Sequence, residues 1–273
     1  MAFNHFIPTV WSDTLLDEFT ATAVFANLVN SEYEGVAAKG NKVRIAGSVM
    51  PVVKDYKAAG RKTNADDITD TSQDLLIDQE KSVDFLVDDV DRVQVAGSVE
   101  TYTRGAAQAL ALDADSYIAA AAVAAGVSVS GAVPATGNAA FDLINEAHKV
   151  LTKNNVPIVG RCVVVNAEFA ALLRKADSKL TNADVSGDTA GLRAGTIGTL
   201  LGARIVESNN TPDDSAPQFI AFHESAIAYV SQVDTVEALR ADDSFADRVR
   251  MLHVYGAKVV RPNAVAVFNK SGS

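Results

Sequence analysis

The sequence predicts an α+β protein, and three features of its apolar pattern support that class. Apolar and polar residues alternate at 41–50 and again around 83–87, as they do in half-buried strands. Between residues 88 and 125, apolar residues recur at steps of three, four and seven, which is the spacing of one face of a long helix. After residue 138, shorter helical and strand patterns alternate along the chain.

The size and charge of the chain exclude several classes of protein. With 273 residues, 48% of them hydrophobic, the chain can bury a core in one large or two small domains, which excludes disorder and collagen-like repeats. It has 24 Lys and Arg residues against 34 Asp and Glu residues, a net charge of -10. Such an acidic surface disfavours tight binding to the phosphate backbone of nucleic acids.

Neither the start of the chain nor its most apolar stretch predicts export or a membrane span. Residues 1–11 lack the basic region followed by an apolar one that a secretory signal requires, so we expect the mature protein to begin near Met1. The stretch 106–127 is rich in alanine and is interrupted by Asp113 and Asp115, which predicts a water-soluble helix.

The first elements that we expect are a helix and a strand. Residues 12–29 carry apolar side chains at helical intervals, with Ser12 in the N-cap position. A helix so near a terminus buries little surface alone and needs the body of the protein or a neighbouring chain to cover it. The run 41–50 then places Val43 and Ile45 on one side of a strand that Pro51 ends.

The segment after Pro51 predicts a long two-stranded arm with a charged tip. We expect the strand at 41–50 to pair with the run at 83–87, and the polar residues between them to form the tip. These tip residues are Lys54, Asp55, Lys57, Gly60, Arg61, Lys62, Asp66 and Asp67. A ribbon of this kind is marginally stable in water, so a projecting arm would rest on a partner surface. A hairpin folded flat on its own domain fits the pattern equally well.

Residues 88–125 predict the longest helix. Asp88, Asp89 and Asp91 lie at its start, where carboxylates complement the positive end of the helix dipole. A helix over 90–125 would be about 50 Å long, which is more than most single domains can cover. The alanines near its end leave little side-chain volume and therefore favour the close approach of another element.

The loop 128–138 contains Gly131, Pro134 and Gly137 and is the best candidate for a domain boundary. Beyond it we expect a helix at 140–151 and a second helix capped by Asn166. That second helix has Glu168 in its first turn and Lys175 in its last. Strands are expected at 161–165, 204–206 and 219–222, and over 257–268 with a break at Pro262. Residues 181–198 predict a polar, glycine-rich loop.

No catalytic, cofactor-binding or metal-binding residue is predicted. The lone Cys162 precedes three valines, which is typical of a buried, inert thiol. The histidines are too far apart in sequence for a helical metal pair: His5, His148, His223 and His253. Adjacent acids have diverging side chains and predict solvated surface: Asp66 with Asp67, Asp213 with Asp214, and Asp242 with Asp243. No phosphate-binding glycine loop or nucleophile elbow is present. An arm and an overlong helix without a catalytic signature indicate a protein that binds copies of itself.

Five segments, taken in their order along the chain, carry a family resemblance. They are residues 11–30, residues 33–45, residues 77–91 leading into the long helix, the stretch GTLLGARIVES at 198–208, and residues 245–262. Together they cover most of the chain. Their order resembles the major capsid proteins of tailed bacteriophages, which have the Hong Kong 97-type fold.

This resemblance implies a division of the chain and a function. The parts would be an N-terminal arm at 1–40, an extended β-hairpin loop at 41–87, a peripheral domain at 88–127 and 236–273, and an axial domain at 128–235. The protein would self-assemble into pentamers and hexamers of an icosahedral shell around the phage double-stranded DNA genome. It would be a virion protein, assembled in the cytoplasm of the bacterial host.

The resemblance also implies partners other than the chain itself. No long charged helical region precedes the arm, so a separate scaffolding protein is expected, together with a portal protein and, in some shells, a decoration protein. DNA would be enclosed without tight specific binding, and neither a membrane nor a cofactor is expected. Lys54, Lys57, Lys62 and Asn263 are similar to the lysine–asparagine crosslinks of one capsid subgroup. Because no matched glutamate is evident to act as a base, solubilising charge is the favoured interpretation.

Two alternatives remain open from the residues. An encapsulin-like nanocompartment would share the fold but would carry a groove for a cargo peptide. A monomeric α/β enzyme with a site in the glycine-rich loop at 181–198 is an alternative from a different class.

Overall fold

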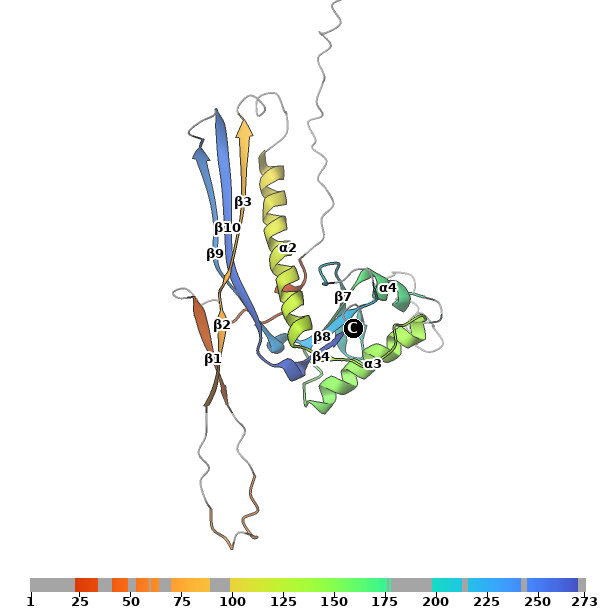
Figure 1. Cartoon of the computed structure of the whole chain (residues 1–273). Helices are drawn as coiled ribbons and strands as arrows, with labels where there is room; N and C mark the ends of the chain where they lie inside the picture. The colour runs from red at the N-terminus through yellow and green to blue at the C-terminus, as the bar shows by residue number, and fades with distance from the viewer. Residues whose placement is uncertain are drawn as a thin grey trace, which may run out of the picture.

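Two β-sheets lie along one long helix in the computed structural model, and a hairpin projects from the body that they form (Figure 1). The structure describes residues 23–33, 41–48, 53–58, 60–63, 70–88, 99–175, 177, 198–212, 216–241 and 245–269. It is a mixed α+β fold, as the sequence predicts. No helix within these residues is both long and apolar enough to cross a membrane.

The larger sheet has six strands in the order β4-β11-β8-β5-β7-β6. Its strands are β4 (Val127–Ser128), β5 (Arg161–Val165), β6 (Thr199–Leu200), β7 (Ala203–Glu207), β8 (Phe219–His223) and β11 (Val265–Phe268). Strand β5 is buried on both faces because Cys162 and Val164 pack on one side, and Val163 and Val165 on the other. This explains why its sequence is uniformly apolar after Arg161, without alternation.

Two helices cover one face of the larger sheet, namely α3 (Gly137–Lys153) and α4 (Ala167–Leu173). The side chain of Thr136 accepts a hydrogen bond from Ala139 N at the start of α3. At the start of α4, Asn166 Oδ1 accepts from Phe169 N at 2.9 Å, as the sequence predicts. The prediction for the other end of α4 is wrong, because the helix ends at Leu173 and Lys175 lies beyond the C-cap.

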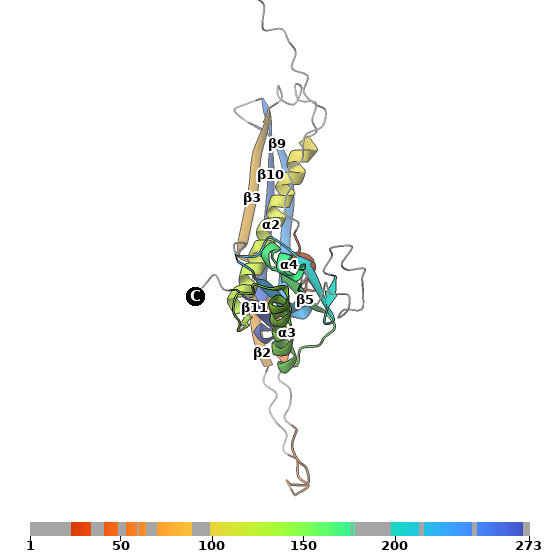
Figure 2. The same ribbon diagram turned by 90° about the vertical axis from the view of Figure 1, so that its right-hand side faces the viewer.

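The smaller sheet has three antiparallel strands in the order β3-β10-β9. They are β3 (Gln79–Asp88), β9 (Ile227–Arg240) and β10 (Ala246–Val259), with a short 3-10 turn η2 (Glu224–Ala226) before β9 and η3 (Pro262–Ala264) after β10. Both β9 and β10 span 14 residues and extend past the larger sheet, as Figures 1 and 2 show.

Helix α2 (Val99–Ala125) serves both sheets. Ala106 and Leu110 pack against Val249 and Met251 of the smaller sheet. One and two turns further on, its side chains enter the main core, where Ile118 is fully buried among residues of the larger sheet. With 27 residues, the helix is about 40 Å long. The sequence predicts a start near residue 90; residues 89–98 lie outside the described part, and the helix ends at Ala125 as predicted.

The projecting hairpin consists of β1 (Lys42–Ser48) and β2 (Asp70–Leu76). Its base is fixed to the body by an apolar cluster of Val43, Ile45, Leu75, Ile77, Ala228 and Val230. Gln73 Nε2 donates to the carbonyl of Val260 at 3.1 Å, and Lys258 Nζ donates to that of Asp74 at 2.8 Å. The backbones come so close at Gly256 that a Cβ there would lie 2.1 Å from the carbonyl oxygen of Leu76.

The predicted pairing of this arm is wrong. The strand at 41–50 was expected to pair with the run at 83–87, but its partner is β2, and the run at 83–87 belongs to β3 and pairs with β10. Strand β2 has the sequence DTSQDLL, in which Leu75 is the only apolar residue that points into the cluster at the base. Its pattern therefore carries too little alternation to be recognised.

The prediction of a helix over residues 12–29 is wrong for the part that the structure describes. Residues 12–22 lie outside that part, and the following segment forms a single 3-10 turn, η1 (Phe25–Asn27). The chain then leaves helical geometry because Asn30 pairs with Ala228 at the start of β9.

We predict that Gly256→Ala destabilises the protein by about 1–3 kcal/mol, because the added methyl group would meet backbone rather than a movable side chain. The measurement is urea unfolding of the unassembled protein, with proteolysis of the hairpin as a local readout. Gly105→Ala in helix α2 is the matched control, since nothing lies within 4 Å of its added Cβ and alanine should stabilise the helix by up to about 1 kcal/mol. Equal stabilities of the two variants would contradict this account of the hairpin base.

Candidate functional site

Three features of the structure are candidates for a functional surface: the tip of the hairpin, the open face of the smaller sheet, and the base of the N-terminal segment. They lie on different elements and have different chemistry. The first two expose side chains that the chain's own core does not use, and the third binds a distant segment to helix α2.

The described residues of the hairpin tip, 53–58 and 60–63, are all exposed. The carboxylate of Asp55 organises a turn there by accepting hydrogen bonds from Lys57 N at 2.9 Å and Ala58 N at 3.1 Å. Gly60 and Arg61 follow with φ angles of 65° and 61°. The tip therefore has local order but packs on no part of its own body, as Figure 1 shows.

Within the described residues, the smaller sheet is covered on one face only. Side chains of β3 alternate, so that Val83 and Phe85 pack toward helix α2 while the residues between them are exposed. On the uncovered face, Leu86, Leu239 and Leu252 are 59%, 45% and 39% exposed. The strand register places Leu86 and Leu239 on either side of Arg248, one on each neighbouring strand. We call these three leucines and the charged residues between them the open face.

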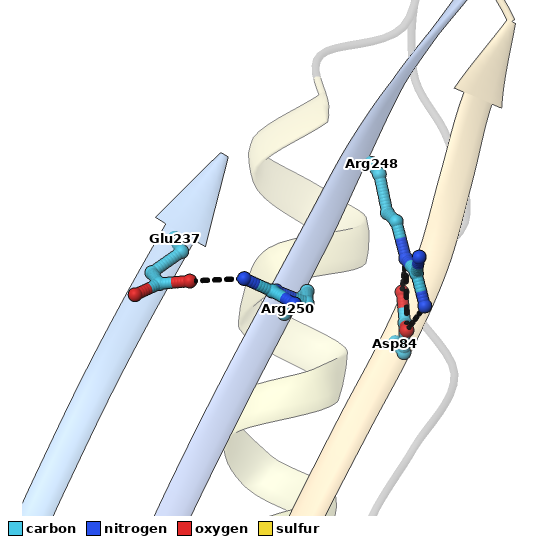
Figure 3. A network of polar contacts seen from close by, with 4 residues as sticks. All are labelled: Asp84, Glu237, Arg248 and Arg250. Carbon is cyan, nitrogen blue, oxygen red and sulfur yellow. Dashed lines mark hydrogen bonds and ion pairs between the residues drawn. The ribbon is translucent and has the colours of Figure 1, made fainter. Parts of the chain in front are cut away.

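The charged side chains of the open face are paired with one another (Figure 3). Arg248 donates from Nε to both carboxylate oxygens of Asp84 at 2.9 and 3.0 Å, and its Nη2 also contacts that carboxylate. Arg250 Nη2 donates to Glu237 at 2.6 Å. The hydrogen bond from Arg248 holds the pKa of Asp84 below its usual value, so the carboxylate stays ionised. A partner can therefore approach the leucines without supplying counter-charges.

The base of the N-terminal segment is held by a buried carboxylate. Asp115 of helix α2 is fully buried and accepts hydrogen bonds from Val24 N at 3.0 Å and Ala26 N at 3.1 Å. The amide of Asn210 donates to the same carboxylate at 2.8 Å. These three neutral donors stabilise the buried carboxylate in place of water.

Apolar packing completes this attachment. Phe25, Leu28 and Val29 are buried in the main core, and the ring of Phe25 stacks on Phe222 with 6.2 Å between centroids. The backbone of Asn30 then exchanges hydrogen bonds of 3.0 Å with β9, to Ile227 O and from Tyr229 N. The end of the predicted N-terminal helix is thus covered by the body of its own chain, not by a neighbour.

The residues considered for chemistry do not converge. Cys162 is buried in β5, and burial raises the pKa of its thiol, which fits an inert side chain. His148, His223 and His253 lie on α3, β8 and β10, and no group of three or more His, Cys, Asp or Glu residues within the described ranges could hold a metal. His5 and the acid pairs at 66–67, 213–214 and 242–243 lie outside those ranges, as does the loop 181–197.

The residues that resemble a crosslinking set are not brought together within one chain. Lys54, Lys57 and Lys62 are exposed at the hairpin tip. Asn263 lies in the η3 turn between β10 and β11, where its carbonyl accepts from Asn154 Nδ2 at 2.8 Å. A bond between the two sets would have to join different copies of the chain.

Two parts of the candidate surfaces are missing from the sequence predictions. Asp115 looked like a polar interruption of an alanine-rich helix, and no local pattern signals that its partners lie 91 and 95 residues away. The open face was missed because β9 was not predicted as a strand. The alternation of buried Val249 and Met251 with exposed Arg248, Arg250 and Leu252 in β10 is the signal that could have found it.

Comparisons with known proteins agree on one family. A family model described as phage capsid protein matches residues 77–268. A solved chain from Mycobacterium phage Che8 is 68% identical with a TM-score of 0.91, and the match covers 100% of both chains. The capsid structure of cyanophage P-SCSP1u is 17% identical with a TM-score of 0.79, covering 98% of this chain and 94% of that one. The mature capsid of bacteriophage PhiM1 is 15% identical with a TM-score of 0.74, covering 97% and 92%. No curated protein sequence matches the chain.

We predict that Asp115→Asn loosens the N-terminal segment from helix α2 by about 1–3 kcal/mol, because an amide offers one acceptor atom in place of two and loses the charge. Hydrogen exchange of the amides at 24–30 is the measurement, and faster exchange there is the expected result. Glu168→Gln, an exposed acid in the first turn of α4, is the control and should leave that segment unchanged. Unaltered protection at 24–30 in Asp115→Asn would show that apolar packing alone holds the segment.

Proposed function

The chain belongs to the phage capsid protein family and is a structural protein of an icosahedral virion shell, not an enzyme; we propose that its copies form the pentamers and hexamers of that shell around a double-stranded DNA genome. The observation that carries this proposal is that two surfaces of the chain, the hairpin and the open face, are not buried by the chain itself. A hairpin extends away from the body while one face of a sheet displays three exposed leucines.

In the proposed mechanism, each hairpin lies across the long helix and smaller sheet of a neighbouring copy. The open face offers leucines over ion pairs that are already satisfied, so covering it gains apolar burial with little desolvation of unpaired charge. The hairpin brings exposed apolar side chains of its own, among them Val53 and Tyr56. Many contacts of this size, repeated around a closed shell, stabilise the assembly through avidity without any single strong interface.

We also propose the division into domains that the resemblance implies. Residues 1–40 act as the N-terminal arm, 41–87 as the extended loop, 88–127 with 236–273 as the peripheral domain, and 128–235 as the axial domain at the centre of each capsomer. Strand β9 continues across the boundary at residue 235, and β11 pairs with β8 in the larger sheet. The two domains therefore form a continuous body without a flexible linker at that boundary.

Further partners follow from the same reasoning. A separate scaffolding protein would set the curvature of the growing shell, and a portal protein would replace one pentamer. The net charge of -10 suits the wall of a container, because a shell that bound DNA tightly would impede packaging and release. The family match argues against the monomeric α/β enzyme and favours a phage shell over an encapsulin-like compartment.

We predict closed shells when the protein is produced together with its scaffolding protein, because each copy then finds partners for its hairpin and open face. Negative-stain electron microscopy is the measurement. Production without the scaffold serves as the comparison and should give irregular or fewer particles. Samples that contain only monomers in both conditions would contradict the proposed function.

We predict that Leu86→Asp abolishes shell formation while the subunit stays folded. Leu86 is 59% exposed, so the change in the free energy of unfolding should stay below about 1 kcal/mol, whereas a charge placed among the leucines would be desolvated on assembly. Particle yield in electron microscopy and urea unfolding of the monomer are measured in parallel. Leu86→Met is the matched control and should assemble, since it keeps an apolar side chain of similar volume. Normal shells from Leu86→Asp would show that the open face is not an interface.

A further inference from the structure

A buried arginine on the larger sheet has no acidic partner. Arg161, at the start of β5, is 3% exposed, and its hydrogen-bond partners among the described residues include no carboxylate. Its guanidinium donates to the carbonyls of Val156 at 2.6 Å and Pro157 at 2.8 Å, and to Thr152 Oγ1 at 3.1 Å. The remaining partner is His148 of helix α3, whose Nδ1 lies 3.1 Å from Nη1.

This contact fixes the protonation state of His148. A guanidinium can only donate, so Nδ1 of His148 must accept, and the ring hydrogen is on Nε2. Nε2 is itself buried and has no hydrogen-bond partner among the residues that the structure describes. A second proton on the ring would therefore have to occupy Nδ1, where it would point at a cation.

None of the ion pairs between described residues joins a carboxylate to His148 or Arg161, so that repulsion is not offset by a paired acid. On α3, Glu146 and Lys149 pair with each other at 2.7 Å. On α4, Glu168 is exposed, and strand β11 has only apolar residues. The strand register sets His223 of β8 opposite Arg161, but its Nε2 lies 3.0 Å from the carbonyl of Val159. Glu224 of η2 is exposed beside Gly160 and forms no ion pair with Arg161.

We propose that His148 and Arg161 form an acid-sensitive latch, in which neutral His148 keeps helix α3 docked on strand β5 and a protonated His148 releases it. The latch joins the C-terminal part of α3 to residues 154–160 and to the start of β5. Its opening would therefore loosen the helical layer of the larger sheet and leave the smaller sheet unaffected. A fall in pH would therefore loosen α3 and the residues around it, and not the smaller sheet.

The direction of the pH effect follows from linkage. Burial, and then the charge of Arg161, lower the pKa of His148 below its ordinary value of 6.5. Unfolded or undocked chains accept a proton near pH 6.5 and the docked state does not, so docking weakens as the pH falls below 6.5. It is independent of this group above that pH, and the loss ends once the pH is below the lowered value.

Hydrogen exchange of the unassembled full-length protein at pH 7.5, 6.5 and 5.5 tests the latch, after correction for the intrinsic pH dependence of exchange. We expect the opening constant of amides in α3 and at 154–165 to rise by up to tenfold per pH unit below 6.5. Amides in β10 should show no comparable rise. His148→Asn, whose Oδ1 can accept from Arg161 but cannot be protonated, should open more readily overall and with no dependence on pH in this range.

His223→Asn is the matched control, because asparagine keeps the cap of η2 and leaves the latch in place, so the pH dependence in α3 should persist. A histidine titration of the wild-type protein by NMR gives an independent readout if His148→Asn fails to fold. The proposal is overturned if His148 titrates at or above pH 6.5, or if His148→Asn loses protection in acid as steeply as the wild type.

Discussion

The whole subunit depends on helix α2 being packed by two sheets at once. Its first half covers the smaller sheet through Ala106 and Leu110, and its second half lies in the core of the larger one through Ile118 and Ala122. Small residues allow this: Gly126, at the end of the helix, already lies against Val265 and Val267 of β11, where a Cβ would clash. Helix α2 thus fixes the position of one sheet relative to the other, and with it the positions of the elements attached to each sheet.

Because one helix packs on both sheets, part of the sheet surface stays exposed. Helix α2 covers one face of the three-stranded sheet, and none of the elements in the described part of the chain covers the other face. The leucines left there lie among ion pairs whose charges are already matched, so the face can be buried without leaving an unpaired charge. The same design explains the hairpin, which is rigid at its base and unsupported at its tip. A shell subunit needs surfaces of this kind, stable when alone and more stable when covered.

How much of this could be predicted from the sequence varies with the range of the interactions. Strand β5 and the cap of α4 were predictable because an apolar run and an Asn at its end are local signals. The hairpin was predicted, but with the wrong return strand, since β2 has one inward apolar residue and β3 has several. The role of Asp115 could not be predicted, because its hydrogen-bond donors come from residues 24–26 and 210. The residues next to Asp115 in sequence give no signal of such distant donors. Contacts between residues so far apart in sequence can be recognised only once the fold is known.

The attachment of the N-terminal segment also constrains how the protein is made. Asn30 pairs with β9 at Ala228, so its partner strand is synthesised about 200 residues later, a delay of roughly 10–40 s at usual rates of translation. Until β9 is made, Asn30 lacks its two backbone hydrogen bonds to that strand, although Asp115 of helix α2 is already present. The attachment of the N-terminal segment to the body is therefore complete only after most of the chain has been synthesised.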